Sequence, residues 1–387
     1  MSSKHSPHVK VYRVDEGHCY SMNDLLAFFG EHGRMRVSDL HVKVNCPPVY
    51  RMDGKLQKMN GPPVDRETAE ALVLSLLADE DAAALKRDRA VDSSYSILGL
   101  QFRINCFYEN DGLAIAVRAL EAAPPEIEQI GFPNGVWGDI VSRQSGLVLV
   151  TGITGAGKST TIAALIARIA AVRPCRIITL EDPIEYRLPS KRAIISQREV
   201  GRDVPGFERG LRDCLREDPD VIFVGEMRDR VSATWTLSAA ETGHLVFSTL
   251  HTRDARGTIT RVLDMFPAVQ QDEVANQLSL GLSHVVCQKL IPRGDGQGRV
   301  VAMEILNNTY AIANLIRLRK LEQVYSHLQT KTKDIPRERM TTLERSLSRL
   351  VGGGVVAPQE AEKWANDVAA FGDEMKRLSQ RAAPRPR

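Results

Sequence analysis

The eight residues from Gly152 to Ser159 constrain the fold more than any other part of the chain. They read Gly-Ile-Thr-Gly-Ala-Gly-Lys-Ser and complete the phosphate-binding pattern G-x-x-x-x-G-K-[ST]. Its glycines let the backbone curl so that successive N–H groups point at phosphate oxygens. An apolar run, 147–151, precedes the loop and a helical pattern, 160–171, follows it. A strand, this loop and a helix in that order predict a P-loop nucleotide-binding domain, in which the helix dipole adds to the anion site.

The side chains of this loop indicate which cofactors it would bind. Lys158 is placed to reach the β- and γ-phosphates, and the hydroxyl of Ser159 to hold Mg²⁺. We therefore expect ATP and Mg²⁺. The residues expected to bind the nucleotide here are Gly152, Thr154, Gly155, Ala156, Gly157, Lys158, Ser159 and Thr160.

A P-loop also needs an acid from a neighbouring strand to support the metal and to activate water. The apolar run 221–224 ends at Gly225 and Glu226, so we expect Glu226 to be the Walker B acid and, with Ser159, a metal ligand. A second acidic cluster, residues 181–185, follows the predicted strand 176–180. Such a cluster is either a solvated acidic turn or a set of carboxylates that bind a metal ion or activate water.

Two histidines bracket another apolar strand. His244 precedes the run that begins at Leu245, and His251 follows Leu250. A single histidine in this setting is most often a satisfied core residue. A pair, one of them facing the nucleotide edge, is expected to sense or position phosphate.

Composition narrows the class of protein. A chain of 387 residues with 43% hydrophobic and 26% charged residues is expected to fold as two globular domains. The net charge of +3 is too small to argue for nucleic acid. No two of the six cysteines have C-x-x-C spacing, so neither a zinc ribbon nor a dithiol site is supported. Neither a 20-residue apolar run nor a signal peptide is found, so we expect a cytoplasmic protein without a transmembrane segment.

The organisation of the chain follows from its strand and helix patterns. Short apolar strands alternate with helices after residue 137, which predicts an α/β domain with a mostly parallel sheet and helices on both faces. A smaller α+β domain precedes it. We expect a flexible lead-in (1–20), the N-terminal domain (21–122), a proline-rich linker (123–137), the ATPase domain (138–310), C-terminal helices (311–372) and a basic tail (373–387).

Taken together, these motifs resemble the ATPases of type II secretion and type IV pili, and within them the PilT-type retraction ATPases. The resemblance covers residues 22 to 370, in family order. Besides the P-loop, the matching blocks are Ser38–His41, Arg51–Gly54, Leu180–Tyr186 (the aspartate box), Gln197–Val200, Leu215–Asp220, Gly225–Asp229 and the histidine box Glu241–Thr252.

The resemblance implies a role for each matching residue. Glu185 would polarise the attacking water, Glu226 would support Mg²⁺, and His244 and His251 would form the catalytic histidine pair. Arginines of the N-terminal domain would reach the phosphates, so the site would close between the domains. Others would stabilise charge, some as arginine fingers across a subunit boundary, or form structural ion pairs. The first group is Arg103 and Arg118, and the second is Arg198, Arg212 and Arg216.

The resemblance also implies an assembly. Such proteins join a PAS-like N-terminal domain to a RecA-like ATPase domain and form homo-hexameric rings, whose domains rotate during turnover. A ring of this kind would lie at the pilus base, peripherally on the inner membrane, drive an inner-membrane platform protein and produce twitching motility. The alternatives are an accessory PilU-like ring subunit that regulates a paralogous retraction ATPase, a secretion or pilus-assembly ATPase, and a nucleic-acid translocase, which the mild charge argues against.

Two stretches depart from the family pattern. Ile153 and Ala156 replace the usual Pro and Ser of the phosphate loop, and both side chains are expected to point away from the nucleotide. The C-terminal retraction signature, usually Ala-Ile-Arg-Asn-Leu-Ile-Arg-Glu, reads Ala-Ile-Ala-Asn-Leu-Ile-Arg-Leu at residues 311–318. The second departure concerns the surface that couples to a partner and leaves the ATPase chemistry untouched.

The phosphate loop and the Walker B acid give the first testable prediction. Lys158→Ala removes the ammonium that neutralises phosphate charge, and Glu226→Ala removes support for Mg²⁺. We expect each variant to lose at least about a hundredfold in Mg²⁺-dependent ATP hydrolysis, measured as phosphate release by the purified protein. Unchanged turnover in both variants would contradict the assignment of this loop.

Overall fold

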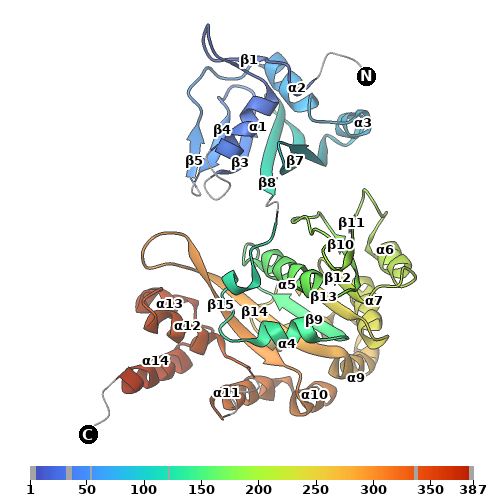
Figure 1. The fold of residues 1–387 in the computed structure, drawn as a ribbon, viewed down its shortest axis with the longest axis vertical. Coiled ribbons are helices and arrows are strands. Elements are labelled where there is room, and N and C mark those ends of the chain that lie inside the picture. Colours follow the sequence, from blue (N-terminus) through green and yellow to red (C-terminus); the bar gives the residue numbers. More distant parts are fainter. Residues whose placement is uncertain (1–5, 32–36, 53–54, 121–122, 335–338, 383–387) are drawn as a thin grey trace. The chain divides into compact units, whose positions relative to one another are not determined.

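The computed structural model describes residues 6–31, 37–52, 55–120, 123–334 and 339–382. The chain divides into two compact units, 1–123 and 124–387. Figure 1 labels their helices and strands along the chain. Each unit has its own hydrophobic core, so each is described separately.

The first unit is an antiparallel sheet with helices, of the α+β class that the sequence predicts. Its strands are ordered β5-β4-β3-β8-β7-β6. In chain order the elements are β1 (Tyr12–Arg13), β2 (Cys19–Tyr20), α1 (Met22–Glu31), β3 (Val37–Val42), β4 (Val49–Met52), β5 (Lys55–Lys58), α2 (Arg66–Leu74), α3 (Asp79–Asp88), β6 (Ala90–Ile97), β7 (Leu100–Glu109) and β8 (Gly112–Leu120).

The core of this unit is formed by the side chains on one face of its sheet. Leu40 of β3, Phe102 of β7 and Val117 of β8 point inward and are fully buried, since successive residues of a strand face opposite sides. α2 begins at Asp65, whose carboxylate accepts a hydrogen bond from the N–H of Thr68. The residues Met52–Lys55 are also a hairpin-turn signal in the sequence. Residues 53–54 lie outside the described part of the chain, but β4 and β5 on either side of them pair antiparallel.

The second unit is a seven-stranded sheet covered by helices, ordered β11-β10-β12-β13-β9-β14-β15 (Figure 1). All neighbouring strands are parallel except β14 and β15. Its sheet-region elements are η1 (Ile127–Gln129), α4 (Val136–Ser142), β9 (Gly146–Thr151), α5 (Lys158–Val172), β10 (Arg176–Glu181), β11 (Ile194–Glu199), α6 (Phe207–Cys214), β12 (Val221–Val224), α7 (Arg230–Glu241), β13 (Leu245–Leu250), α8 (Ala255–Asp264), η2 (Ala268–Gln270), α9 (Gln271–Gly281), β14 (Leu282–Pro292) and β15 (Arg299–Asn307).

Helices follow the sheet to the end of the described chain. They are α10 (Tyr310–Arg317), η3 (Leu321–Gln323), α11 (Val324–Asp334), α12 (Leu343–Gly352), α13 (Pro358–Trp364) and α14 (Val368–Ala382). α10 and α11 join the main core of the sheet, whereas α12, α13 and α14 share a small core that contains Leu347 and Phe371 and continues onto Ile291 and Ala302 of the β14–β15 pair. The helical region is thus packed onto the edge of the sheet.

Both faces of the central sheet are buried, which explains its nearly continuous apolar strands. Along β9, Leu147 and Leu149 join the core on one face, while Val148 and Val150 join the core on the other. α4 and α5 cover the second of these faces, and α7, α8 and α9 cover the first. Burial of each such aliphatic side chain stabilises the fold by about 1.5–3 kcal/mol.

Three expected irregular segments contain regular structure. Residues 6–20 of the expected lead-in carry β1 and β2, and Tyr12 is buried with its hydroxyl donating to the Pro62 carbonyl at 2.8 Å. In the expected linker, Ile127 and Val136 are buried in the second unit's core, which ties that proline-rich stretch to the unit. Of the expected tail, residues 373–382 belong to α14, and residues 383–387 lie outside the described part.

Candidate functional site

The phosphate loop connects the end of β9 to the start of α5. Gly152, Gly155 and Gly157 have φ angles of 150°, 76° and 84°, which favour glycine. At Gly152 a side chain is also excluded by lack of space, because a Cβ would lie 2.5 Å from the Gln288 carbonyl oxygen. At Gly155 a Cβ would meet nothing within 4 Å, so the loop is open on that side. These conformations fit a backbone that wraps around phosphate, as the sequence predicts.

The substituted loop residues differ in exposure. Ile153 is 49% exposed, so its side chain does point into solvent. Ala156 is 2% exposed and lies under the loop, and its Cβ fills the space beside Gly152. Thr154 is exposed, while Ser159 and Thr160 are half-buried at the start of α5. The hydroxyl of Thr160 is 2.8 Å from that of Tyr186, which ties the turn after β10 to α5.

Lys158 is buried, and its ammonium lies over the loop. Nζ donates to the carbonyls of Gly152 at 3.0 Å and Ile153 at 3.3 Å. Burial lowers the pKa of Lys158, and the negative charges of Glu226 and Glu185 oppose that shift. The ammonium is therefore already inside the loop that would receive a phosphate group.

A chain of polar contacts runs from Lys158 across the carboxyl edge of the sheet. Lys158 Nζ lies 3.5 Å from His251 Nδ1, and His251 Nε2 lies 3.3 Å from Glu226 Oε1. Arg228 donates from Nε to Glu226 Oε2 at 2.9 Å and from a terminal nitrogen to Asp182 Oδ2 at 3.2 Å. We call these five residues the edge network. They meet because the strands that precede them, β9, β13, β12 and β10, are parallel and end at one edge.

Arg228 and Gln288 extend the site beyond the residues that the sequence indicated. Arg228 belongs to the Walker B block, but nothing in the motif shows that it joins Glu226 to the aspartate box. Gln288 lies on β14 and is 2% exposed. Its amide donates to the Ala156 carbonyl at 2.6 Å and accepts from the Thr161 hydroxyl at 3.0 Å, so it fixes the loop from below. No spacing in the sequence signals Gln288, which is 132 residues from Ala156.

The acidic turn after β10 contains two different kinds of glutamate. Glu185 is exposed, and its charge acts on Lys158. Glu181 is buried and accepts hydrogen bonds from the Thr179 hydroxyl at 2.6 Å and the Gln197 amide at 3.1 Å. Burial raises the pKa of Glu181 to about 7, helped by the negative charge of Glu185.

His244 does not lie with the edge network within one chain. It precedes β13, and its carbonyl accepts a hydrogen bond from Gly146 at the start of β9. Its Nδ1 lies 3.0 Å from both the Ala239 carbonyl and the Thr242 hydroxyl. The six residues of β13 separate it from His251 by about 20 Å, so the two members of the expected histidine pair occupy opposite edges of the sheet.

The three candidate arginines of the second unit, Arg198, Arg212 and Arg216, fall into two groups. Arg198 on β11 is engaged in an ion pair with Glu217 at 2.6 Å. Arg212 at the end of α6 and Arg216 just beyond it are exposed, and their side chains make no hydrogen bond or ion pair within the described part of the chain. The structure therefore ties Arg198 into its own chain and leaves Arg212 and Arg216 facing solvent.

Arg103 and Arg118, the two candidate arginines of the first unit, are direct cross-strand neighbours. Arg103 of β7 pairs with Arg118 of β8, which pairs with Asp39 of β3, which pairs with Arg51 of β4. Opposite residues share a face, so these four side chains form one row on the face opposite the core. Arg118 donates to Asp39 at 2.8 Å, Arg51 lies 3.6 Å from the same carboxylate, and Arg103 lies 3.7 Å from Asp92. The row therefore carries three arginines against one buried acid, Asp39, which leaves it with a net positive charge.

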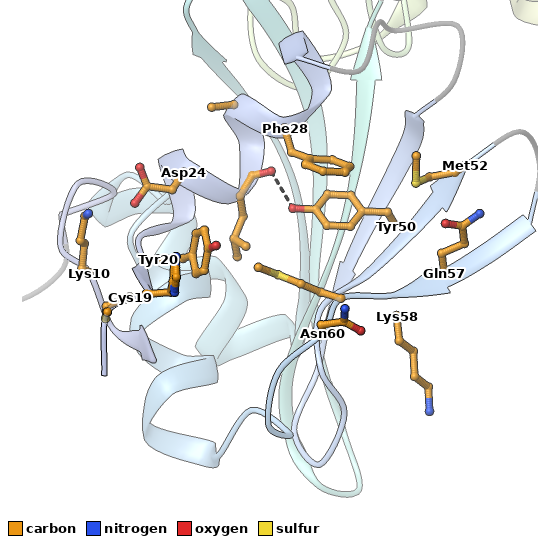
Figure 2. A pocket seen from close by; sticks show the side chains of 15 residues that line it. Lys10, Cys19, Tyr20, Asp24, Phe28, Tyr50, Met52, Gln57, Lys58 and Asn60 are labelled. Atoms are coloured by element: carbon orange, nitrogen blue, oxygen red, sulfur yellow. Dashed lines mark hydrogen bonds between the residues drawn. The ribbon is translucent and has the colours of Figure 1, made fainter. Parts of the chain in front are cut away.

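The first unit also contains a cavity of about 800 Å³, between α1 and the β4–β5 hairpin. Figure 2 shows Phe28 lying against Tyr50, with ring centroids 4.5 Å apart, and the Tyr50 hydroxyl donating to the Leu25 carbonyl at 2.9 Å. Lys10 and Lys58 line opposite sides of the cavity (Figure 2). It contains none of the residues that the motifs single out as catalytic.

The residues at the phosphate loop fit Mg²⁺ only in company with a nucleotide. Within the described ranges, no group of three or more His, Cys, Asp or Glu side chains is arranged to hold a metal ion. Mg²⁺ characteristically uses one or two protein oxygens together with phosphate oxygens and water. Ser159 and Glu226 would supply that protein share, and the ion would neutralise phosphate charge.

Known proteins resemble this chain over most of its length. The family model described as "Type II/IV secretion system protein" matches residues 24–326. The chain is 41% identical to "Type IV pilus retractation ATPase PilT" of Pseudomonas aeruginosa, over 89% of this chain and 98% of that protein. It is 32% identical to "Type IV pilus ATPase PilU" of the same organism, over 84% of each chain. A crystal structure of "the Pilus Retraction Motor PilT and Bound ADP" has a TM-score of 0.82 and 40% identity, and covers 90% of this chain and 99% of that one.

The length and hydropathy of the helices bear on whether the chain could cross a membrane. Among the described residues, none of the helices combines the length and the apolar character that crossing a membrane requires.

The position of Gln288 under the loop leads to a prediction. Gln288→Ala removes the bonds to Ala156 and Thr161 and leaves two buried polar groups without partners, at a cost of about 1–3 kcal/mol. We expect nucleotide affinity to fall about tenfold or more, measured by binding of a fluorescent ADP analogue. Gln323→Ala, at an exposed glutamine of η3, should bind as the unmodified protein does. Equal affinity in both variants would contradict the role of Gln288.

The buried Glu181 leads to a second prediction, on pH. Because its pKa is about 7 in the fold and 4.5 otherwise, its contribution to stability is complete below pH 4.5 and is lost as pH rises to 7. Glu181→Gln does not titrate. The drop in unfolding free energy between pH 5 and pH 8 should therefore shrink by up to about 3 kcal/mol, measured by urea unfolding of the second unit. Glu208→Gln, at an exposed position, should leave the drop unchanged, and an equal drop in all three proteins would refute this assignment.

Proposed function

The chain belongs to the type II/IV secretion system protein family and is an ATPase, and we propose that it is the hexameric, Mg²⁺-dependent motor that retracts type IV pili. The observation that carries the proposal is the edge network, which puts the P-loop lysine, the Walker B glutamate and the histidine box in contact. The proposal is supported by 41% identity to the retraction ATPase along nearly all of that protein.

In the proposed reaction each residue of the edge network has a task. Lys158 would turn from the loop carbonyls to the β- and γ-phosphates, and Ser159 and Glu226 would hold Mg²⁺, which would supply charge neutralisation. His251 lies between Lys158 and Glu226 and keeps both oriented. Arg228 fixes the other oxygen of Glu226 and connects it to Asp182.

Water activation is assigned to Glu185. Its carboxylate is exposed and acts electrostatically on Lys158, which is consistent with a base near the γ-phosphate. Glu181 beneath it is too enclosed by Thr179 and Gln197 for that role. The buried Glu181 instead holds the turn that carries Glu185.

The remaining arginines are proposed to act on the same phosphates. Arg212 and Arg216, exposed and without a side-chain partner in the described chain, suit the role of arginine fingers toward a neighbouring subunit. Arg103 and Arg118 belong to a basic strip that suits phosphate. Arg198, paired with Glu217, is better suited to a structural ion pair, and His244, at the other edge of the sheet, to a contact outside its own chain's nucleotide site.

The partners follow from the same proposal. The ring would act on an inner-membrane platform protein from the cytoplasmic side of the pilus base, bound peripherally. The part of the chain assigned to that contact is α10, which carries the altered signature 311–318. There Ile312 and Ile316 are buried, whereas Leu318, at the position of the family's glutamate, is 53% exposed.

A second candidate function is that of an accessory ring subunit that regulates a paralogous retraction ATPase. The observation in its favour is that the stretch 311–318 lacks the family's arginine and glutamate, with Ala313 of α10 and Leu318 just after α10 in their places. The match to "Type IV pilus ATPase PilU" keeps this function within the family, although the identity is lower, at 32%. Turnover by the purified protein alone decides between the two, because robust activity without a paralogue excludes a purely accessory role.

A cellular experiment tests the proposed function. Deletion of the gene should leave cells with excess surface fibres and without twitching, because assembly continues while retraction stops. Complementation with the unmodified gene should restore twitching, and complementation with Lys158→Ala should not. Cells without fibres would instead indicate an assembly ATPase, and unchanged fibres with normal twitching would overturn the proposal.

A further inference from the structure

A cavity of about 230 Å³ lies inside the second unit, where the sheet meets the C-terminal helices. Its walls come from the start of α8, from β15, from η3 and α11, and from the α13–α14 connection. The residues that line it are Asp254, Ala255, Arg256, Glu304, Glu322, Val324, Tyr325, Ser326, Leu328, Asn366 and Asp367. One water molecule occupies roughly 30 Å³ of liquid, so the cavity has room for a small organic group.

Glu304 is the buried group in this wall that lacks a full set of partners. Its residue is 1% exposed. Oε1 accepts a hydrogen bond from the N–H of Ala255 at 2.7 Å, whereas Oε2 has no hydrogen-bond partner among the described residues. A buried carboxyl oxygen without a partner is costly, by about 1–3 kcal/mol or more, so it signals a ligand at this position.

The charges around the cavity indicate the sign of that ligand. Asp254, Glu304, Glu322 and Asp367 are acidic, and Arg256 is the basic residue of the lining. Lys289 is nearby, but its ammonium donates to the Trp364 carbonyl at 2.8 Å and to Asn366 Oδ1 at 2.7 Å. The cavity is therefore acidic, and the neighbouring lysine is committed elsewhere.

The arrangement of the acids distinguishes an organic cation from a metal ion. No set of three acidic or histidine side chains in the described chain converges closely enough to hold a metal. A guanidinium or ammonium group carries several N–H donors on a larger frame, and its stem needs apolar contact. Val324 and Leu328, both buried, together with Tyr325, offer that contact.

We propose that this cavity binds an organic cation, a guanidinium or primary ammonium group, with Glu304 as its buried counter-ion. Such a cation would connect the ATPase core to the C-terminal helices. On the core side, Glu304 holds the first N–H of α8, three residues after Thr252 and close in sequence to His251 of the edge network. On the helical side, Glu344 of α12 accepts from the N–H groups of Asn366 and Asp367 and from the Tyr325 hydroxyl.

Proton release offers a specific signature of this binding mode. Burial raises the pKa of Glu304 to about 8, and the charges of Asp254 and Glu344 add to the shift, while the Ala255 N–H and Lys289 oppose it. Cys287 lies opposite Glu304 on β14 and, being fully buried, has its pKa raised as well, so it stays a neutral thiol. A bound cation favours the ionised carboxylate, so at pH 7 its uptake should release close to one proton from Glu304. Well above pH 8 that proton is already gone, and release should vanish.

The test uses calorimetric titration of the full chain with agmatine, which carries a guanidinium and a primary ammonium. Titrations at pH 7 in buffers of different ionisation heat count the released protons. We expect binding with proton release for the unmodified protein. Glu304→Gln should bind at least about tenfold more weakly and release none, because it removes the buried charge but keeps the acceptor for Ala255. Glu273→Gln, an exposed change on α9, should match the unmodified protein.

Two further arms complete the experiment. Melting curves check the fold of Glu304→Gln, whose neutral amide should be tolerated where the carboxyl is itself mostly protonated at pH 7. A blocked Gly-Arg-Gly peptide that binds more tightly than agmatine would identify a protein side chain as the source, and the reverse would identify a free small molecule. Absence of binding by both, equal binding by a folded Glu304→Gln, or displacement of agmatine by Mg²⁺ or Ca²⁺ would overturn the proposal.

Discussion

The shared carboxyl edge of the parallel sheet is the constraint on which this site depends. Lys158, Asp182, Glu226 and His251 follow four different strands, and parallel pairing brings the ends of those strands together. Pairing fixes the register of the strands, so loops that are far apart in sequence present their side chains to one place. If neighbouring strands were antiparallel, half of these loops would lie at the opposite edge of the sheet, where His244 lies.

Electrostatic balance along this edge follows from the same geometry. Positive and negative groups alternate from Lys158 through Glu226 and Arg228 to Asp182, so each buried or half-buried charge has an opposite neighbour. Burial alone would favour the neutral lysine, and the nearby carboxylates keep the ammonium form available for phosphate. Burial raises the pKa of Glu181 and of Glu304, and among the described residues neither carboxyl forms an ion pair that would reverse the shift.

Much of the fold could be predicted from local pattern. The runs 147–151, 176–180, 221–224 and 245–248 each became a strand of the sheet because their apolar, β-branched residues suit burial on both faces. The pattern did not predict β11, β14 and β15 beside this core, nor β1, β2, β6 and β8 in the first unit. β6 alternates half-buried and exposed residues at an edge, and β14 carries polar residues such as His284 and Gln288 that are buried by their neighbours.

By itself the sequence determined the P-loop, the acids of the Walker B and aspartate boxes, and the family, because these depend on residue type at short spacing. Tertiary structure alone decided that Gln288 supports the loop and that Arg228 joins two boxes. It also decided that the two histidines lie at opposite edges of the sheet, and that one oxygen of the buried Glu304 has no hydrogen-bond partner among the described residues. The physical reason is that such contacts depend on strand order and register, which bring together residues 46 positions apart (Arg228 and Asp182) or 132 positions apart (Gln288 and Ala156), and no local spacing records them.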